Sequence, residues 1–216
     1  DRDFLFLRAA DVIAADIRAA LVHEERVTLA VPGGTTPGPV FDTLSGIALD
    51  WERVDVTLTD ERWVGEDSDR SNARLGRRRL LTGKAGAAAF HPLWRDRPAP
   101  EAALEELTAD IAPILPVQVL LLGMGDDMHT ASIFPDADRR DEALAADAPP
   151  LLPIRRPGEA EARVTLTMPV LKQAMKIHLL IAGAAKKEAV QRAATLSPEE
   201  APVAGVLANA TVHWAE

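Results

Sequence analysis

The chain contains no cysteine and no tyrosine, and aromatic residues make up only 4% of its 216 positions. The lack of cysteine excludes disulfides, thiolate chemistry and zinc sites that need sulfur ligands, and it suits a cytoplasmic protein. Because aromatics are scarce, the core must consist mainly of Leu, Val, Ile and Ala. Hydrophobic residues reach 47% of the chain, which is enough for a substantial folded core.

Long apolar runs and basic segments are also missing. No apolar stretch approaches the roughly 20 residues that span a bilayer, so we expect no membrane partner. The first residues lack a cationic leader followed by an apolar segment, which argues against a signal peptide. The net charge of −9 argues against a nucleic-acid partner, since nonspecific binding needs a basic surface. A few local cations can still hold an anionic small substrate.

Helical and strand patterns alternate along the chain. Helical spacing covers residues 8–25, 71–81, 101–114 and 184–194, and β-rich runs cover 26–31, 54–59, 117–122, 163–167, 177–182 and 211–214. The segment 136–162 is expected to be a loop with one short strand at 151–155. This order predicts an α/β fold that is Rossmann-like, a mainly parallel sheet with helices on both faces. With no internal repeat and no linker, residues 1–216 are expected to form one domain.

A glycine turn follows the first predicted strand, at Gly33-Gly34-Thr35-Thr36. Backbone N–H groups at a helix N-terminus can cradle a phosphate, and the hydroxyls add donors. The alternative is an ordinary turn in which Thr36 caps a helix that starts at Pro37. The turn is not a P-loop, because Gly-Lys-Ser/Thr is absent.

Three basic residues lie at the ends of predicted strands or helices. Arg62 follows a predicted strand, and its planar fork suits oxyanions; the alternative is a solvated loop that pairs Arg62 with Glu61 or Asp60. Lys186 lies near a helix N-terminus, which is unfavourable for a cation unless an anion binds there; the alternative is a solvated lysine. Arg163 opens a strand. A role in the site and an ion pair with the acidic segment before it agree equally well with the sequence.

The segment Gly123-Met124-Gly125-Asp126-Asp127-Met128-His129 follows an apolar run. An adjacent carboxylate can orient a histidine and raise its basicity, and strand ends are where open α/β sheets place their chemistry. The alternative is helix capping by an aspartate. The third glycine of a dinucleotide fingerprint is missing, so we expect no nicotinamide cofactor, and no metal-ligand set stands out. The other four histidines are expected to be structural.

Six segments in this order resemble the 6-phosphogluconolactonases, which share their fold with the glucosamine-6-phosphate deaminases. They are Pro-Gly-Gly-Thr-Thr-Pro (32–37), Thr-Asp-Glu-Arg-Trp-Val (59–64), Ser-Asn-Ala-Arg-Leu (71–75), Leu-Gly-Met-Gly-Asp-Asp-Met-His-Thr-Ala-Ser-Ile-Phe-Pro (122–135), Arg-Val-Thr-Leu-Thr (163–167) and Gly-Ala-Ala-Lys-Lys-Glu-Ala (183–189). The resemblance implies a sugar-phosphate isomerase/deaminase-like fold. It also implies hydrolysis of 6-phospho-D-glucono-1,5-lactone, the second step of the oxidative pentose phosphate pathway, without a cofactor.

The resemblance also implies site residues. His129 falls on the family's general base, and Asp127 is expected to orient it. Positions that hold the sugar phosphate correspond to Gly34, Thr35, Thr36, Arg62 and Lys186, and Arg163 matches an arginine near the site. Where the family has glycine this chain has Met128, which costs about 1 kcal/mol if the position needs φ > 0.

The alternatives to a lactonase are a glucosamine-6-phosphate deaminase and a sugar-phosphate-binding domain without catalysis. Around the position of His129 the deaminases have a segment similar to Gly-His-Ile-Ala-Phe-Asn-Glu-Pro, with a glutamate five residues after the histidine. This chain has Phe134 at that position, and a phenylalanine cannot transfer protons. A sugar-phosphate-sensing domain without catalysis usually carries a DNA-binding module, and no such extension is visible. We expect a monomer or a weak dimer.

Overall fold

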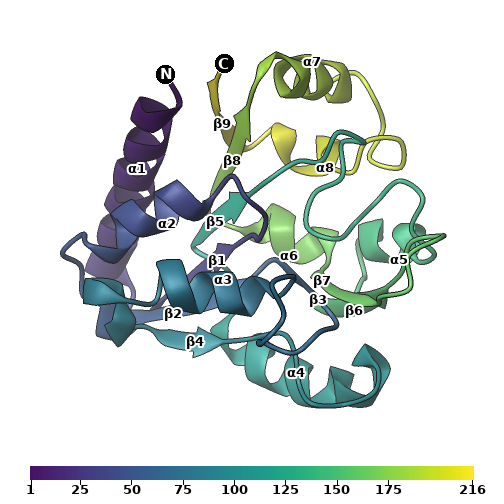
Figure 1. Ribbon diagram of the computed structural model, residues 1–216, viewed down its shortest axis with the longest axis horizontal. Helices are drawn as coiled ribbons and strands as arrows, with labels where there is room; N and C mark the ends of the chain where they lie inside the picture. The colour runs from purple at the N-terminus through teal and green to yellow at the C-terminus, as the bar shows by residue number, and fades with distance from the viewer.

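The computed structural model describes residues 1–216 as two sheets surrounded by helices (Figure 1). The larger sheet has the strand order β4-β2-β1-β5-β8-β9, and every neighbouring pair is parallel. Its strands are β1 (Val27–Val31), β2 (Val54–Leu58), β4 (Ala89–His91), β5 (Val119–Leu122), β8 (Lys176–Ala182) and β9 (Ala210–Ala215). The predicted Rossmann-like, mainly parallel sheet is confirmed.

The central strands are buried along their whole length. Every residue of β1, β2 and β5 is buried, which explains why β5 is a continuous apolar run and β1 nearly so. Strand β2 alternates apolar and polar residues, and its buried Asp55 and Thr57 are hydrogen-bonded to Arg26 and to the carbonyl of His91. Helix α1 (Arg2–His23) packs on β1, β5, β8 and β9 and against α2 (Gly38–Ser45). The two chain ends meet beside α1, where Arg2 Nε donates to the carbonyl of Glu216 at 3.1 Å (Figure 1).

The remaining helices are short. They are α3 (Asn72–Arg79), α4 (Leu104–Ile111), α5 (Arg140–Leu144), α6 (Met168–Gln173), α7 (Ala184–Ala193) and α8 (Ala204–Leu207). The predicted helix over 101–114 is divided, because 3₁₀ turns at Pro100–Ala103 and Ala112–Ile114 flank α4. Strand β4 and helices α5 and α8 were not predicted. No helix is both long enough and apolar enough to span a bilayer.

Two helix starts differ from the sequence prediction. Helix α1 begins at Arg2 rather than at residue 8, because the Asp1 side chain caps it by accepting from Asp3 N and because Leu5 extends its buried face. Helix α2 begins at Gly38, with Pro37 in the capping position and no side-chain capping bond. The prediction that Thr36 caps this helix is therefore wrong.

A second, antiparallel sheet was not predicted. It has the order β3-β7-β6, built from β3 (Asp60–Arg62), β7 (Arg163–Leu166) and β6 (Leu151–Ile154). Strand β3 has no apolar alternation, so its sequence resembles a charged loop. The solvated-loop alternative is wrong, because Asp60 and Glu61 are buried. The pairing places Arg62 directly opposite Arg163.

The strand order sets where a ligand can bind. From β1 the chain builds outward through β2 to β4, then crosses back to place β5 on the other side of β1. The crevice outside the carboxyl ends of two such strands is where open α/β sheets bind ligands. The turn 32–37 follows β1 and the turn 123–129 follows β5, so both sequence motifs flank this crevice.

Candidate active site

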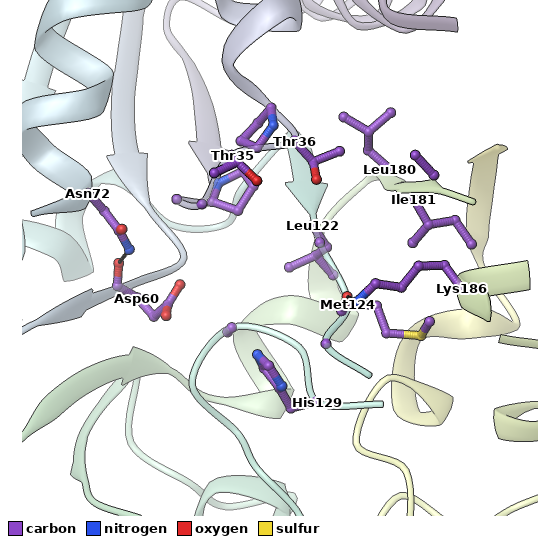
Figure 2. A pocket seen from close by; sticks show the side chains of 18 of the residues that line it. Thr35, Thr36, Asp60, Asn72, Leu122, Met124, His129, Leu180, Ile181 and Lys186 are labelled. Atoms are coloured by element: carbon purple, nitrogen blue, oxygen red, sulfur yellow. Dashed lines mark hydrogen bonds between the residues drawn. The ribbon is translucent and has the colours of Figure 1, made fainter. Parts of the chain in front are cut away.

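A cavity of about 280 Å³ lies at the carboxyl ends of β1 and β5 (Figure 2). It brings together side chains from both sheets and from α3 and α7. Seven of the sequence-predicted site residues line it: Gly34, Thr35, Thr36, Arg62, His129, Arg163 and Lys186. The eighth, Asp127, does not line the cavity but is hydrogen-bonded to His129, which does.

The turn after β1 forms one wall of the cavity. Gly34 has a φ of +89°, a conformation that strains residues with a side chain. A Cβ on Gly33 would lie 1.8 Å from Asn72 Oδ1, so this position needs glycine because the Asn72 amide packs against the backbone. The side chains of Thr35 and Thr36 face the cavity (Figure 2).

His129 and Asp127 form a hydrogen-bonded pair at the opposite wall. His129 Nδ1 is 2.5 Å from Asp127 Oδ1, which also accepts from His129 N at 3.1 Å. Because Asp127 engages Nδ1, the other ring nitrogen, Nε2, is the one available for proton transfer with a ligand. Burial raises the pKa of Asp127, but the hydrogen bond and charge of His129 outweigh it and hold that pKa below its usual value.

The turn that carries His129 contains a strained residue. Met128 has a φ of +65°, which costs a residue with a side chain about 1 kcal/mol or more. Its side chain is nearly buried in the hydrophobic core, and burial of a methionine contributes about 1.5–3 kcal/mol. Backbone bonds from Val203 N to Met128 O and from Met128 N to Gly125 O also hold the turn. Methionine at this position is therefore compatible with His129 lining the cavity.

Lys186 enters the cavity from the first turn of α7. Its Nζ donates to the carbonyl of Met124 at 2.7 Å and lies 3.0 Å from the exposed carboxylate of Asp126. The next residue, Lys187, points elsewhere, with its Nζ 4.4 Å from the centroid of the Trp214 ring. The alternative that Lys186 is merely solvated is wrong.

The two paired arginines of the small sheet also line the cavity. Arg62 donates to the carbonyl of Arg70 and to Asn72 Oδ1, not to the carboxylates of Asp60 or Glu61. Arg163 pairs with Glu159 at 3.3 Å, as the acidic-segment alternative predicted, and it lines the cavity as well. The Nε atoms of both arginines are buried without a hydrogen-bond partner. Both guanidinium groups therefore keep an unused donor.

Two polar side chains of the cavity were missed from the sequence. Asp60 accepts from Ser132 Oγ at 2.6 Å and from Thr59 Oγ1 at 2.7 Å, and it is 6% exposed. Asn72 donates to the carbonyl of Asp60 at 3.0 Å, as Figure 2 shows. Asp60 comes almost directly after a buried strand, and this position could have identified it as a site residue. Nothing in the sequence indicates that Asn72 contacts Asp60.

The other histidines lie outside the cavity, as expected. His91 is 2.9 Å from Asp55 and 3.1 Å from Asp110. His178 is 2.6 Å from Asp16 and 2.9 Å from His213. The fifth histidine, His23, is exposed in the last turn of α1.

Glu61, the central residue of β3, supports the cavity without lining it. It is fully buried and accepts backbone hydrogen bonds from Arg62, Asn72 and Ala73, so it caps the start of α3. Burial raises the pKa of Glu61 to about 7, against the lowering effect of these three donors. This buried carboxyl joins β3 and α3, the two elements that carry Arg62 and Asn72.

We expect Glu61 to make the stability of the fold depend on pH. Its folded-state pKa of about 7 lies above the unfolded value of about 4.3, so the folded protein binds more protons between these values. The contribution is fully present below the unfolded pKa and is lost as pH rises through the folded one. Urea unfolding across this range should show a steeper loss of stability for the wild type than for Glu61→Gln, which cannot titrate. Equal slopes would rule out titration of Glu61 in this range.

Comparisons with known proteins agree over the whole chain. The family model described as glucosamine-6-phosphate isomerases/6-phosphogluconolactonase matches residues 1–214. The chain is 38% identical over 213 residues to a 6-phosphogluconolactonase of Rhizobium meliloti (strain 1021), covering 95% of this chain and 92% of the relative. It is 39% identical over 211 residues to one of Pseudomonas aeruginosa, covering 94% and 87%. A crystal structure of a 6-phosphogluconolactonase from Shewanella baltica OS155 has a TM-score of 0.95 and 31% identity, covering 100% of this chain and 95% of that one.

Proposed function

The chain belongs to the glucosamine-6-phosphate isomerase/6-phosphogluconolactonase family, and we propose that it hydrolyses 6-phospho-D-glucono-1,5-lactone to 6-phospho-D-gluconate. It is a carboxylic ester hydrolase of the oxidative pentose phosphate pathway, with residues 1–216 acting as one catalytic domain. The observation that carries this proposal is the cavity that holds the His129–Asp127 pair, Lys186 and the turn 32–37 together. A general base and an anion-binding site thus line the same cavity.

The phosphate of the substrate binds against the turn after β1 and Lys186. The hydroxyls of Thr35 and Thr36, the backbone at Gly34 and the ammonium of Lys186 supply donors and positive charge. This contact lies away from the reacting carbon. Its binding energy therefore orients the lactone ring against His129 rather than taking part in the chemistry.

Hydrolysis proceeds by attack of water on C1 of the lactone. His129 removes a proton from the water as its oxygen bonds to C1, and Asp127 stabilises the resulting imidazolium. Arg62 and Arg163 stabilise the oxyanion that forms on the carbonyl oxygen, supported by the unused Nε donors on both side chains. The bond from C1 to the ring oxygen then breaks, and His129 returns its proton to that oxygen.

The deaminase alternative is weaker because of Phe134. Its ring is 2% exposed and packs on the His129 ring at a centroid distance of 4.2 Å. An apolar ring therefore occupies the place next to the histidine where a proton-transferring carboxyl would be needed. The non-catalytic alternative does not account for an oriented His–Asp pair facing the cavity.

An activity assay tests the proposal. Purified protein should accelerate hydrolysis of freshly made 6-phosphogluconolactone above its spontaneous rate, measured by pH-stat or by a coupled assay. Ammonia release from glucosamine 6-phosphate should stay at background. Ammonia release without lactone hydrolysis would instead assign the deaminase reaction.

Lys186→Ala is expected to raise KM about 10- to 100-fold with kcat little changed. A charge-assisted hydrogen bond to phosphate contributes about 1.5–3 kcal/mol, and this contact exists in both ground and transition states. Steady-state kinetics check the prediction. The matched control is Lys187→Ala, one position along the same helix, which should keep the wild-type KM. An unchanged KM in Lys186→Ala would remove this lysine from the phosphate site.

A further inference from the structure

Arg156 lies beside the His129–Asp127 pair although it does not line the cavity. It follows strand β6, and its Nη2 is 3.7 Å from Asp127 Oδ2. The other oxygen of the same carboxylate, Oδ1, holds His129 Nδ1. Asp127 therefore has the imidazole on one oxygen and a guanidinium on the other.

An aromatic ring fixes the guanidinium in this place. The Cζ of Arg156 is 4.3 Å from the centroid of the Phe134 ring, a cation–π distance. The same ring packs on the imidazole of His129, and Arg163 Cζ lies 4.8 Å from its centroid. Asp136 at 3.1 Å and Glu159 at 3.3 Å bind the guanidinium of Arg156 from the solvent side. Such contacts limit the rotamers that Arg156 can adopt.

We propose that Arg156 is a positioning residue that fixes the orientation of Asp127 and, through it, the ring orientation and tautomer in which His129 accepts a proton. This inference rests on the function proposed above. Both the backbone N and Nδ1 of His129 contact Oδ1 of Asp127, whereas Arg156 is the cation beside Oδ2, so its guanidinium further limits rotation of the carboxylate away from Nδ1. The structure thus assigns a role to a side chain outside the cavity.

The charge of Arg156 acts in a definite direction. The cation lowers the pKa of Asp127 and so favours the ionised carboxylate, the form that accepts from Nδ1 of His129. The charged groups around the pair are Asp126, Asp136, Arg156, Glu159, Arg163 and Lys186. Asp136 and Glu159 offset part of the charge of Arg156, so its influence on the pair should be moderate.

Steady-state kinetics of Arg156→Gln give the first test. We expect kcat to fall about 3- to 30-fold with KM within about twofold, the size typical of coupling between contacting charged residues. Arg156→Lys, which keeps the charge but not the planar stack on Phe134, should recover part of kcat. The matched control is Arg155→Gln, because Arg155 pairs with Glu101 on the exposed surface and should behave as wild type.

A double-mutant cycle separates action through Asp127 from a general structural effect. In an Asp127→Asn background, Arg156→Gln should change kcat by less than about twofold, because the carboxylate on which it acts is gone. A full additional loss in that background would overturn the proposal. So would a wild-type kcat in Arg156→Gln.

A spectroscopic readout works without any substrate. Nitrogen-15 NMR of the ring nitrogens should show a hydrogen-bonded Nδ1–H for His129, assigned by its loss in His129→Ala. That signal should shift or broaden in Arg156→Gln and not in Arg155→Gln. A shift in a protein that lacks lactone hydrolysis would contradict the proposed function and leave the positioning role standing. An unchanged signal with unchanged kcat in an active enzyme would contradict the positioning role alone.

Discussion

Replacing His129 with alanine is expected to lower kcat about 10²- to 10⁴-fold, the usual contribution of a general acid–base group. KM should stay close to wild type, because the phosphate contacts at the turn 32–37 and Lys186 remain. The reason is the geometry of the pair: Asp127 engages Nδ1, and the ring faces the cavity in Figure 2. No other histidine lines the cavity and can replace it.

The measurement is steady-state hydrolysis of the lactone, corrected for its spontaneous rate. The control is His23→Ala, which removes an exposed histidine at the end of α1 and should keep full activity. Circular dichroism and thermal unfolding establish that the variant is folded. A His129→Ala protein with near-wild-type kcat would eliminate this residue as the base and, with it, the proposed mechanism.

The large sheet could be predicted because its strands carry a one-dimensional signal. Strands β1 and β5 are buried on both faces and appear as short, largely apolar runs between turns, and β2 alternates apolar and polar residues as a strand does. The carboxyl end of each strand is then known from the chain direction alone. For this reason the two turns after β1 and β5 could be assigned to the site before their spatial neighbours were known.

The small sheet could not be predicted, because its stability depends on contacts between distant segments. Strand β3 is Asp-Glu-Arg, and its central carboxyl is buried only because backbone donors at the start of α3 satisfy it. The pairing of Arg62 with Arg163 across this sheet spans about half of the chain. No local pattern records such a contact.

The residues of the site also divide into those with a local sequence pattern and those identified only by their contacts in the fold. Residues in the motifs of the turns and strand ends could be named from the sequence. Asn72 and Arg156 could not, because no local pattern records their contacts with the site: Asn72 with Asp60 and Arg62, and Arg156 with the carboxylate of Asp127. Met128 shows a local preference overridden by packing, since its buried side chain offsets a positive φ.

The second large effect is expected from one methyl group at Gly125. A Cβ at this position would lie 2.1 Å from Nδ1 and Cε1 of His129 and 2.8 Å from Asp127 Oδ1. The ring or the turn must therefore move, and a displacement of about 1 Å in a catalytic group can cost about 10²-fold in rate. We expect Gly125→Ala to lower kcat by about that factor.

Two further variants test whether the loss of rate comes from the clash with His129. Gly123→Ala alters the same turn, but its Cβ would meet no atom within 4 Å, so kcat should stay within about threefold of wild type. In a His129→Ala background the clash with the ring no longer exists, so adding Gly125→Ala should lower the residual kcat by less than about twofold. A loss in Gly125→Ala that persisted in full without the imidazole would mean that the methyl group disrupts the turn itself. The rate would then depend on the backbone of this turn, and the close approach of His129 to Gly125 would not be what the glycine serves.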